Sequence, residues 1–247
     1  MVHVDELIRA LDDLLDPVAF DDLGPNGLQV PGQGSIERVV TGVTAQRALF
    51  ERAAQERAQL VLVHHGLFWN FAPVGLTPLL AERLRPLFRH DVALAAYHLP
   101  LDAHPEVGNN ALLADALGAG GHVAFAGIGR GATFADPLPA TQLFARVARV
   151  TGREPLVFDS GPPAVRRLAI VSGGAASRLD QAVAEGYDAF LTGEPKENVM
   201  ADAREAGIHF IAAGHYATET LGVRRLGDWL ADRFDVEHIW VDIPNPV

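Results

Sequence analysis

Short apolar runs alternate with longer amphipathic segments along most of this chain. Residues 39–43 and 60–65 are two such runs, and each predicts a strand. The four apolar residues at 60–63 predict that the second strand is buried on both faces. Between them, apolar residues at helical spacing over 45–57 predict a helix with Thr44 as its N-cap. The same reasoning predicts further strands at 92–97, 122–126, 168–171, 189–191, 209–213 and 239–241. It predicts further helices at 4–15, 78–87 (interrupted by Pro86), 109–117 (ended by Gly118), 143–150, 179–185, 198–205 and 218–234.

Strands separated by helices predict an α/β fold. Such units place neighbouring strands parallel and cover both faces of the sheet with helices, so we expect mixed, mainly parallel sheets. Residues 38–66 and 167–194 both run through a strand, a tight turn, a helix, a second strand and a polar, glycine-containing end. We interpret this as a weak internal duplication that gives two related halves, although any two βαβ units share much of the pattern.

A stretch rich in glycine and proline marks the best candidate boundary between the halves. It covers residues 127–139 and interrupts the alternation of apolar runs. We therefore predict a linker there, with a first half at residues 1–126 and a second half at residues 127–247.

Composition narrows the class of protein. The chain has 247 residues, of which 49% are hydrophobic and 21% charged, as is usual for a globular protein with a sizeable core. It has no cysteine, which excludes disulfides and thiolate ligands, so any metal would be bound by histidine and carboxylate side chains. The net charge of -11 disfavours nucleic acid as a partner, although a local basic patch remains compatible with it. We find no signal peptide and no apolar stretch that could cross a bilayer, so we expect a cytoplasmic protein without a membrane partner.

Two histidines, His64 and His65, stand side by side where the run at 60–65 ends. Neighbouring side chains on a strand point to opposite faces, so both rings can serve one site only if the backbone turns, which Gly66 allows. The alternative is that each imidazole simply bonds to a backbone carbonyl.

Two more polar clusters follow predicted strands. One contains His98, Asp102 and His104, and the other contains His215 and Glu219. Because ligands gather beyond the carboxyl ends of parallel strands, clusters that are distant in sequence can converge. The four-residue spacing of His215 and Glu219 places both on one helix face.

Each of these residues also has a simpler explanation. Glu219 suits the first turn of a helix, where the helix dipole favours an acid. Asp102 suits a turn, and His98 and His104 are more typical of supporting or surface residues than of metal ligands.

With His98 and His104 set aside, the clusters supply three histidines and two carboxylates without a thiol. That exceeds the needs of one tetrahedral zinc, and it suits two ions roughly 3.5–4 Å apart, bridged by a carboxylate and a water. Imidazole and carboxylate ligands are compatible with zinc, iron, manganese or nickel. The five side chains are His64, His65, Asp102, His215 and Glu219.

Other segments carry weaker signals. Residues 22–30 are dense in turn formers and predict a plain loop, although its Asn and Gln side chains could reach a ligand. Gly173 and Gly174 follow a strand, as in a phosphate-cradling turn, but the Lys-Ser/Thr of a phosphate loop and the full dinucleotide spacing are missing. The chain has no Gly-x-Ser-x-Gly elbow, which leaves serine hydrolase chemistry without support.

Taken in order, the conspicuous segments of this chain resemble the NIF-three-like dinuclear metal-centre family, also known as GTP cyclohydrolase I type 2. These segments are PNGLQV at 25–30, VTGVT at 40–44, VHHG at 63–66, HLPLD at 98–102, GNN at 108–110, LTGE at 191–194 and AGHYATE at 213–219. The closing DIPNP at 242–246 resembles the bacterial YbgI-type subgroup. The match spans nearly the whole chain, which makes it specific.

The resemblance implies two similar three-layer α/β/α halves, a homohexameric toroid, and a site for two divalent ions that faces an internal cavity. Matched residue by residue, it implies that the first half carries the metal ligands His64, His65 and Asp102. The second half would carry His215 and Glu219, with Glu219 as the bridging carboxylate.

For some members, the family name implies opening of the GTP purine ring with release of formate, and the same centre could hydrolyse a phosphoester. We therefore predict a metal-dependent hydrolase of nucleotide-like substrates, in which metal-activated water is the nucleophile and His98 or Glu194 moves a proton. One alternative is a non-enzymatic toroidal scaffold that binds nucleic acid or a protein partner in DNA repair or transcription regulation. A metal chaperone or storage protein is the other.

Overall fold

The structure, a computed structural model, describes residues 1–73 and 75–247. Its internal contacts divide the chain into two compact units. Unit 1 comprises Met1–Leu101 and Gly222–Ile243, and unit 2 comprises Asp102–Leu221 and Pro244–Val247.

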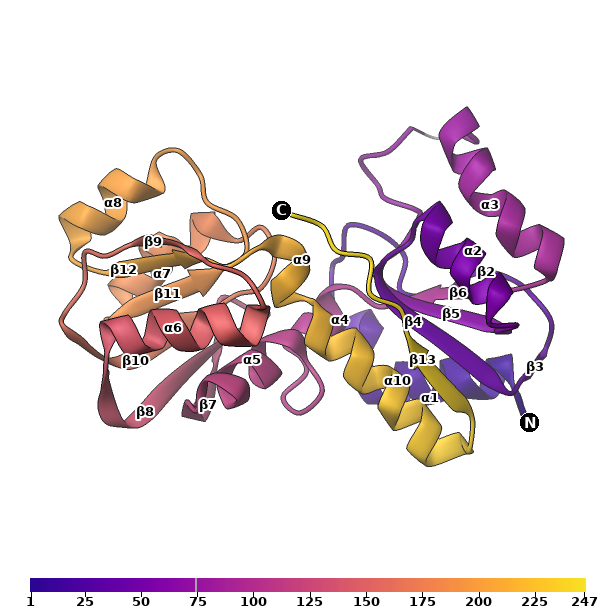
Figure 1. The fold of residues 1–247 in the computed structure, drawn as a ribbon, viewed down its shortest axis with the longest axis horizontal. Coiled ribbons are helices and arrows are strands. Elements are labelled where there is room, and N and C mark those ends of the chain that lie inside the picture. Colours follow the sequence, from indigo (N-terminus) through magenta and orange to yellow (C-terminus); the bar gives the residue numbers. More distant parts are fainter. Residues whose placement is uncertain (74) are drawn as a thin grey trace. The chain divides into compact units, whose positions relative to one another are not determined.

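Unit 1 is built on a five-stranded mixed sheet with the strand order β13-β4-β5-β6-β2 (Figure 1). The first four strands in this order are parallel, and β2 pairs antiparallel with β6 at one edge. The strands are β2 (Gly27–Val30), β4 (Arg38–Thr44), β5 (Leu60–His65), β6 (Ala93–Ala96) and β13 (Glu237–Trp240), beside a small ladder of β1 (Val2–His3) and β3 (Ser35–Ile36). The helices are α1 (Val4–Leu15), η1 (Pro17–Ala19), α2 (Arg47–Gln55), α3 (Pro78–His90) and most of α10 (Thr220–Phe234).

Helices cover both faces of this sheet, which gives three layers. Val61 and Val63 of β5 pack in one cluster with buried residues of α2 and α3. Leu60 and Leu62 alternate with them and are fully buried on the other face, where α1 and α10 lie (Figure 1). The continuous apolar run at 60–65 therefore reflects burial on both faces, as predicted.

Unit 2 is built on a six-stranded mixed sheet with the order β7-β8-β10-β11-β12-β9. The central strands β10, β11 and β12 are parallel, whereas β7, β8 and β9 pair antiparallel with their neighbours. The strands are β7 (Gly120–Phe125), β8 (Gly129–Pro139), β9 (Leu156–Phe158), β10 (Ala164–Ile170), β11 (Ala189–Thr192) and β12 (His209–Ala212). The helices are α5 (Asn109–Leu117), α6 (Ala140–Thr151), η2 (Ala176–Arg178), α7 (Leu179–Ala184), α8 (Val199–Ala206) and α9 (His215–Thr218), and the short α4 (Leu99–Ala103) leads in from unit 1.

Unit 2 also has three layers. Leu168 and Ile170 of β10 belong to a core cluster that includes α5 and α6. Ala169 alternates with them and belongs to a second cluster with α7 and α8. The sheet is thus buried between two helical layers.

The two units share one strand topology. Unit 1 contains the order β2-β6-β5-β4 and unit 2 the order β9-β12-β11-β10, and in both the first strand is the antiparallel one. In both, a histidine and a carboxylate four residues apart follow the equivalent strand: His98 and Asp102 after β6, and His215 and Glu219 after β12. This agrees with the interpretation of the chain as an internal duplication.

Every strand and helix predicted from periodicity is present, with ends shifted by a few residues. The predicted linker at 127–139 is wrong, because most of it forms β8, which pairs with β7 on one side and β10 on the other. Its glycines permit close packing: a Cβ on Gly131 would lie 1.9 Å from the hydroxyl oxygen of Tyr187. The division into units also differs from the predicted halves, because residues 102–126 join unit 2 and Gly222–Ile243 join unit 1.

Two local predictions need correction. Thr44 remains in β4, because the N–H of Ala45 continues the strand pairing by donating to the carbonyl of His65 at 2.8 Å, so the helix begins only after Gln46. Pro86 does not interrupt α3, which runs on to His90. Proline removes one backbone donor from a helix, and here burial of Leu84 and Leu87 holds the helix around it.

Of the helices that the structure describes, none is both long and apolar enough to span a bilayer.

Candidate metal centre

In unit 1 the candidate site begins at the end of β5. His64 is fully buried, and its Nδ1 lies 3.0 Å from the carbonyl oxygen of Tyr97. His65 Nδ1 lies 3.3 Å from the hydroxyl oxygen of Thr44. A backbone carbonyl can only accept, so Nδ1 of His64 carries the proton and its Nε2 keeps the lone pair that a metal needs. Sequence analysis offered a bond to a backbone carbonyl as an alternative to metal binding. In the structure this bond orients the His64 ring and fixes its tautomer, as metal-ligating histidines require.

His98 completes a cluster of three imidazoles. Its ring centroid lies 5.1 Å from that of His64 and 5.6 Å from that of His65, and the first two rings are 4.6 Å apart. Each of the three residues offers a nitrogen within 4.8 Å of the others, close enough to share a metal ion. Sequence reasoning gave His98 a supporting or proton-transfer role, and its position in the structure also allows it to contribute a donor nitrogen.

The loop at 22–30 holds His98. Asp22 Oδ1 lies 2.6 Å from His98 Nδ1, and Asn26 Oδ1 accepts the backbone N–H of His98 at 2.7 Å. Burial alone would raise the pKa of Asp22, but hydrogen bonds from His98, Asn26 and the N–H of Leu99 lower it below its usual value. The carboxylate thus stays ionised and orients the imidazole.

The same loop supports the chain beyond the histidines. Gln29 accepts the backbone N–H of Leu67 at 2.8 Å and donates to the carbonyl of Pro25 at 2.8 Å. A Cβ on Gly66 would lie 2.2 Å from the Gln29 amide nitrogen, so Gly66 is required for this close approach. The segment predicted to be a plain loop is therefore a structural support of the site.

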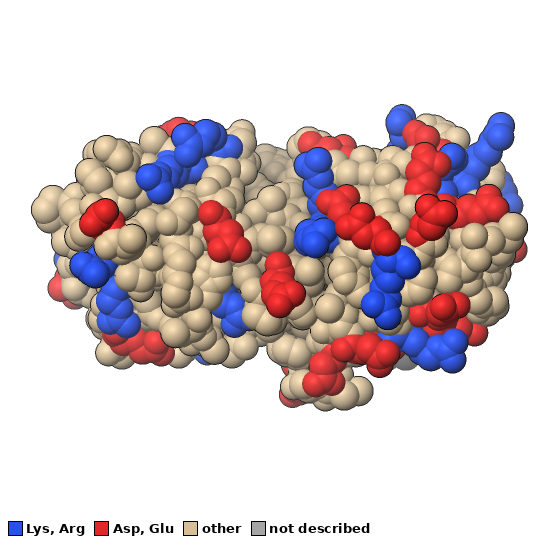
Figure 2. Space-filling view, turned by 90° about the horizontal axis from the view of Figure 1, so that it is seen from below, with Lys and Arg blue, Asp and Glu red and all other residues tan. Residues whose placement is uncertain are grey.

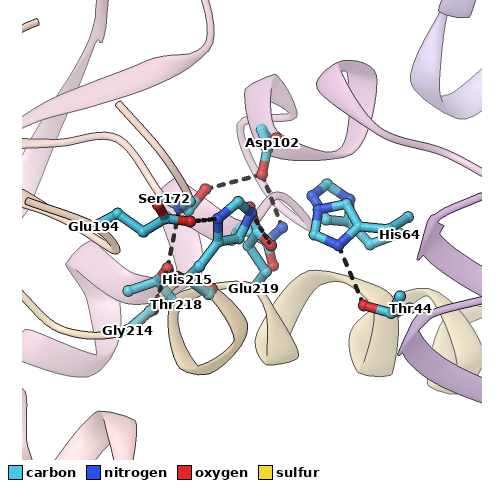
Figure 3. A network of polar contacts seen from close by, with 12 residues as sticks. Thr44, His64, Asp102, Ser172, Glu194, Gly214, His215, Thr218 and Glu219 are labelled. Atoms are coloured by element: carbon cyan, nitrogen blue, oxygen red, sulfur yellow. Dashed lines mark hydrogen bonds and ion pairs between the residues drawn. The ribbon is translucent and has the colours of Figure 1, made fainter. Parts of the chain in front are cut away.

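In unit 2 the candidate site is centred on His215, at the start of α9. His215 Nδ1 hydrogen-bonds to Glu194, and its Nε2 lies 3.2 Å from Glu219 Oε2 (Figure 3). Burial alone would lower the pKa of His215, but contacts with Glu219 and Glu194 raise it to about 9. The ring is thus held between two carboxylates, one on each nitrogen.

The helix predicted over 218–234 begins at Thr220 as α10, whereas His215 belongs to a separate short helix, α9, and Glu219 lies between the two. Thr218 stabilises the break, because its hydroxyl lies 2.9 Å from the carbonyls of both Gly214 and His215 and accepts the N–H of Gly173 at 3.1 Å. The expected proximity of His215 and Glu219 is present, although a continuous helix does not provide it.

Asp102 is the second buried carboxylate of unit 2. Its Oδ1 accepts from the amide of Asn109 at 2.8 Å and from the hydroxyl of Ser172 at 2.9 Å (Figure 3). Asp102 and Glu219 are both nearly inaccessible to solvent, and each offers an oxygen within 4.8 Å of the other. Two buried carboxylates at this distance repel each other unless a proton or a cation lies between them.

The turn at Gly173 and Gly174, which resembled a phosphate cradle, packs against this cluster. Gly173 has a left-handed backbone with φ of +66°, and a Cβ on it would lie 2.3 Å from Glu219 Oε1. The N–H of Gly173 is used by Thr218, and the N–H of Ala175 by the hydroxyl of Thr192 at 3.1 Å. The turn is therefore a close-fitting support for Glu219.

His104 has a local role. Its Nδ1 accepts the backbone N–H groups of Glu106 and Val107, both at 3.1 Å. This agrees with the expectation that His104 is a supporting residue.

Both units present nitrogen and oxygen donors only, from imidazole and carboxylate groups. This donor set is compatible with zinc, iron, manganese or nickel. The supporting residues Asp22, Asn109, Ser172 and Thr218 were not identified from the sequence, although Asn109 and Thr218 lie in conspicuous motifs and Asp22 begins the segment 22–30.

Comparison with known proteins gives whole-length matches. The sequence profile of the Duf34/NIF3 (NGG1p interacting factor 3) family matches residues 2–246. A protein of Pseudomonas aeruginosa named GTP cyclohydrolase 1 type 2 homolog is 44% identical over 99% of each chain. Among solved structures, protein ybgI, described as of unknown function, matches with a TM-score of 0.95, 41% identity and complete coverage of both chains. A protein of Thermus thermophilus matches with a TM-score of 0.93, 39% identity and complete coverage.

Proposed function

Because this chain belongs to the Duf34/NIF3 family, we propose that it is a dinuclear-metal hydrolase that acts on nucleotide-like substrates. The observation that carries the proposal is the pair of donor clusters: three imidazoles in unit 1, and in unit 2 the buried carboxylates of Asp102 and Glu219, with His215 in contact with Glu219. The name of the P. aeruginosa relative supports GTP or a similar nucleotide as the substrate class.

Five side chains are the proposed ligands of two divalent ions, in line with the family resemblance. His64 and His65 would come from unit 1, and Asp102, His215 and Glu219 from unit 2. Hydrogen bonds orient these side chains: Tyr97 holds His64, Thr44 holds His65, Asn109 and Ser172 hold Asp102, and Glu194 holds His215. Glu219 is the proposed bridging carboxylate, because it is buried and lies near both Asp102 and His215.

When bound, a pair of divalent ions supplies hydroxide at neutral pH and stabilises negative charge on a reacting oxygen. The chain's own contribution is to move protons and to orient the ligands. His98 is the proposed proton carrier, since Asp22 fixes its Nδ1 and thereby directs Nε2 away from that contact. Glu194 is the second proposed carrier: its side chain is partly exposed to solvent while it contacts His215 Nδ1.

Two reactions fit this arrangement. One is attack of water on an electron-poor carbon of the GTP purine ring, which opens the ring and releases formate. The other is hydrolysis of a phosphoester. Both need an activated water and a group that transfers a proton, so the substrate decides between them.

Elemental analysis and turnover assays test the proposal together. Purified protein is expected to contain two divalent ions per chain, and metal-loaded protein is expected to convert GTP, another nucleotide or a phosphodiester. Glu219→Gln should lose metal and turnover, whereas Glu205→Gln, an exposed glutamate on α8, should retain both. Two bound ions with no turnover of any of these substrates would favour the scaffold or storage alternative.

The proposal includes a homohexamer in the cytoplasm, where nucleotides are available. Light scattering on purified protein should give six times the mass of one chain. Nucleic acid is a disfavoured partner, because the net charge is -11 and acidic and basic side chains are interspersed over most of the face in Figure 2. Steep, salt-dependent affinity for DNA would contradict this part of the proposal.

A further inference from the structure

An aromatic pair, Trp69 and Phe71, stands beside the histidine cluster of unit 1. The Trp69 ring lies edge-on to His98, with centroids 5.1 Å apart and an interplanar angle of 86°, and its centroid is 6.1 Å from that of His65. Trp69 is therefore in direct ring contact with the proposed proton carrier, and it marks the border of the donor cluster.

The backbone on both sides of Trp69 is held in place. The N–H of Asn70 donates to the carbonyl of Leu23 at 2.8 Å. A Cβ on Gly24 would lie 2.3 Å from the carbonyl oxygen of Phe68 and 3.3 Å from the Trp69 ring, so the two segments are in close contact. Trp69 thus occupies a preorganised position.

Phe71 continues the stack outward. Its ring is nearly parallel to that of Trp69, with an interplanar angle of 17° and centroids 5.6 Å apart, and 71% of the residue is exposed. Single exposed apolar residues are common on protein surfaces. Phe71 is distinguished by its position, because its ring stacks on Trp69, which in turn contacts His98.

We propose that Trp69 and Phe71 form the platform on which the planar heteroaromatic base of a nucleotide stacks. The inference rests on the proposed function and names the part of the substrate that this pair recognises. A parallel, offset ring on an exposed aromatic face is the geometry that base–aromatic stacking uses, and every base has a suitable π-face. The base lies on Phe71, and the remainder of the nucleotide extends towards the histidines.

Binding measurements with two fragments of a nucleotide test the platform. Guanosine provides the base without phosphate, and ribose 5-phosphate provides the phosphate without the base. Stacking on an aromatic side chain has a typical strength that predicts about 5- to 150-fold weaker guanosine binding for Phe71→Ala. Ribose 5-phosphate should bind the variant and the wild type equally, and Phe71→Tyr, which keeps the ring, should restore guanosine binding.

Phe88 on α3 provides a matched control, because it is another exposed phenylalanine of unit 1, 64% accessible to solvent. Phe88→Ala should leave guanosine affinity unchanged. The platform is overturned if the wild type does not bind guanosine, or if Phe71→Ala binds it as the wild type does. It is also overturned if Phe71→Ala alters the oligomeric state while Phe88→Ala does not, because a second copy of the chain would then be the partner of Phe71.

All titrations are repeated on metal-loaded protein and on protein stripped with a chelator. This separates the two proposals. If no metal binds, the proposed function is contradicted, and guanosine binding still tests the platform separately. If metal content is normal but Phe71→Ala binds guanosine as the wild type does, only the platform proposal is contradicted.

Discussion

Replacing Gly173 by alanine isolates the close fit between the turn after β10 and the Glu219 carboxylate. The added Cβ would lie 2.3 Å from Glu219 Oε1, and the residue has a φ of +66°. A left-handed alanine costs about 1–2 kcal/mol, and overpacking a well-packed site adds about 1–3 kcal/mol. We expect Gly173→Ala to lower the free energy of unfolding of metal-free protein by about 2–5 kcal/mol. Because Glu219 must shift, we also expect metal affinity to fall about 10–100-fold.

Gly152 provides the matched control for this experiment. It has a φ of +68°, and a Cβ on it would have no atom within 4 Å. Gly152→Ala therefore has only the cost of a left-handed alanine, about 1–2 kcal/mol, and should leave metal affinity unchanged. Urea unfolding followed by circular dichroism gives the free energies, and isothermal titration with Zn²⁺ or Mn²⁺ gives the affinities. Equal effects of the two substitutions on both measurements would refute the reasoning.

Three further outcomes are expected. Thr218→Val leaves the N–H of Gly173 without its acceptor and should lower the free energy of unfolding by about 1–3 kcal/mol in urea titrations. Thr220→Val, at a half-buried hydroxyl on α10, is the control and should change it little. Equal losses in the two variants would contradict this. Because the pKa of Asp22 is lowered in the folded state, its carboxylate stabilises the fold above its unfolded pKa of about 3.9 and loses this contribution as pH falls through the folded pKa. The difference in stability between metal-free wild type and Asp22→Asn should therefore shrink below about pH 4. A difference that does not depend on pH would contradict this. Adding a divalent metal at about 100 times its dissociation constant should stabilise the wild type by about 2.7 kcal/mol, seen as a rise in Tm that EDTA reverses, and an unchanged Tm would contradict binding to the folded state.

The sequence predicted the periodic elements of the fold because burial imposes a strong pattern on them. β5 and β10 are buried between two helical layers and therefore read as continuous apolar runs. Apart from β8, the strands that were missed are short, such as β2 with four residues and β9 with three. Segments of that length contain too few positions to show a period. β8 was predicted to be a linker because it is rich in glycine and proline. These residues are common in loops, but glycine also occurs in strands that pack closely against their neighbours.

The sequence singled out the candidate ligands because each lies at the end of a strand or shortly after it, where chemistry-bearing side chains gather in α/β folds. Their supports were not, because each partner is distant in sequence. Asp22 and His98 are 76 positions apart, and Asp102 and Ser172 are 70 apart, so no local pattern links them. The role of Gly173 depends likewise on Glu219, which belongs to another segment of the chain. A single sequence shows which residues can bind a metal, whereas the fold shows which residues hold them in position.

The central claim is that this chain binds two divalent ions through His64, His65, Asp102, His215 and Glu219. Anomalous diffraction from a crystal of metal-loaded protein, collected on either side of the absorption edge of the metal, tests it most directly. The account predicts two peaks per chain, roughly 3.5–4 Å apart, with Glu219 in contact with both. A single peak, or two peaks that these five side chains do not bind, would contradict it.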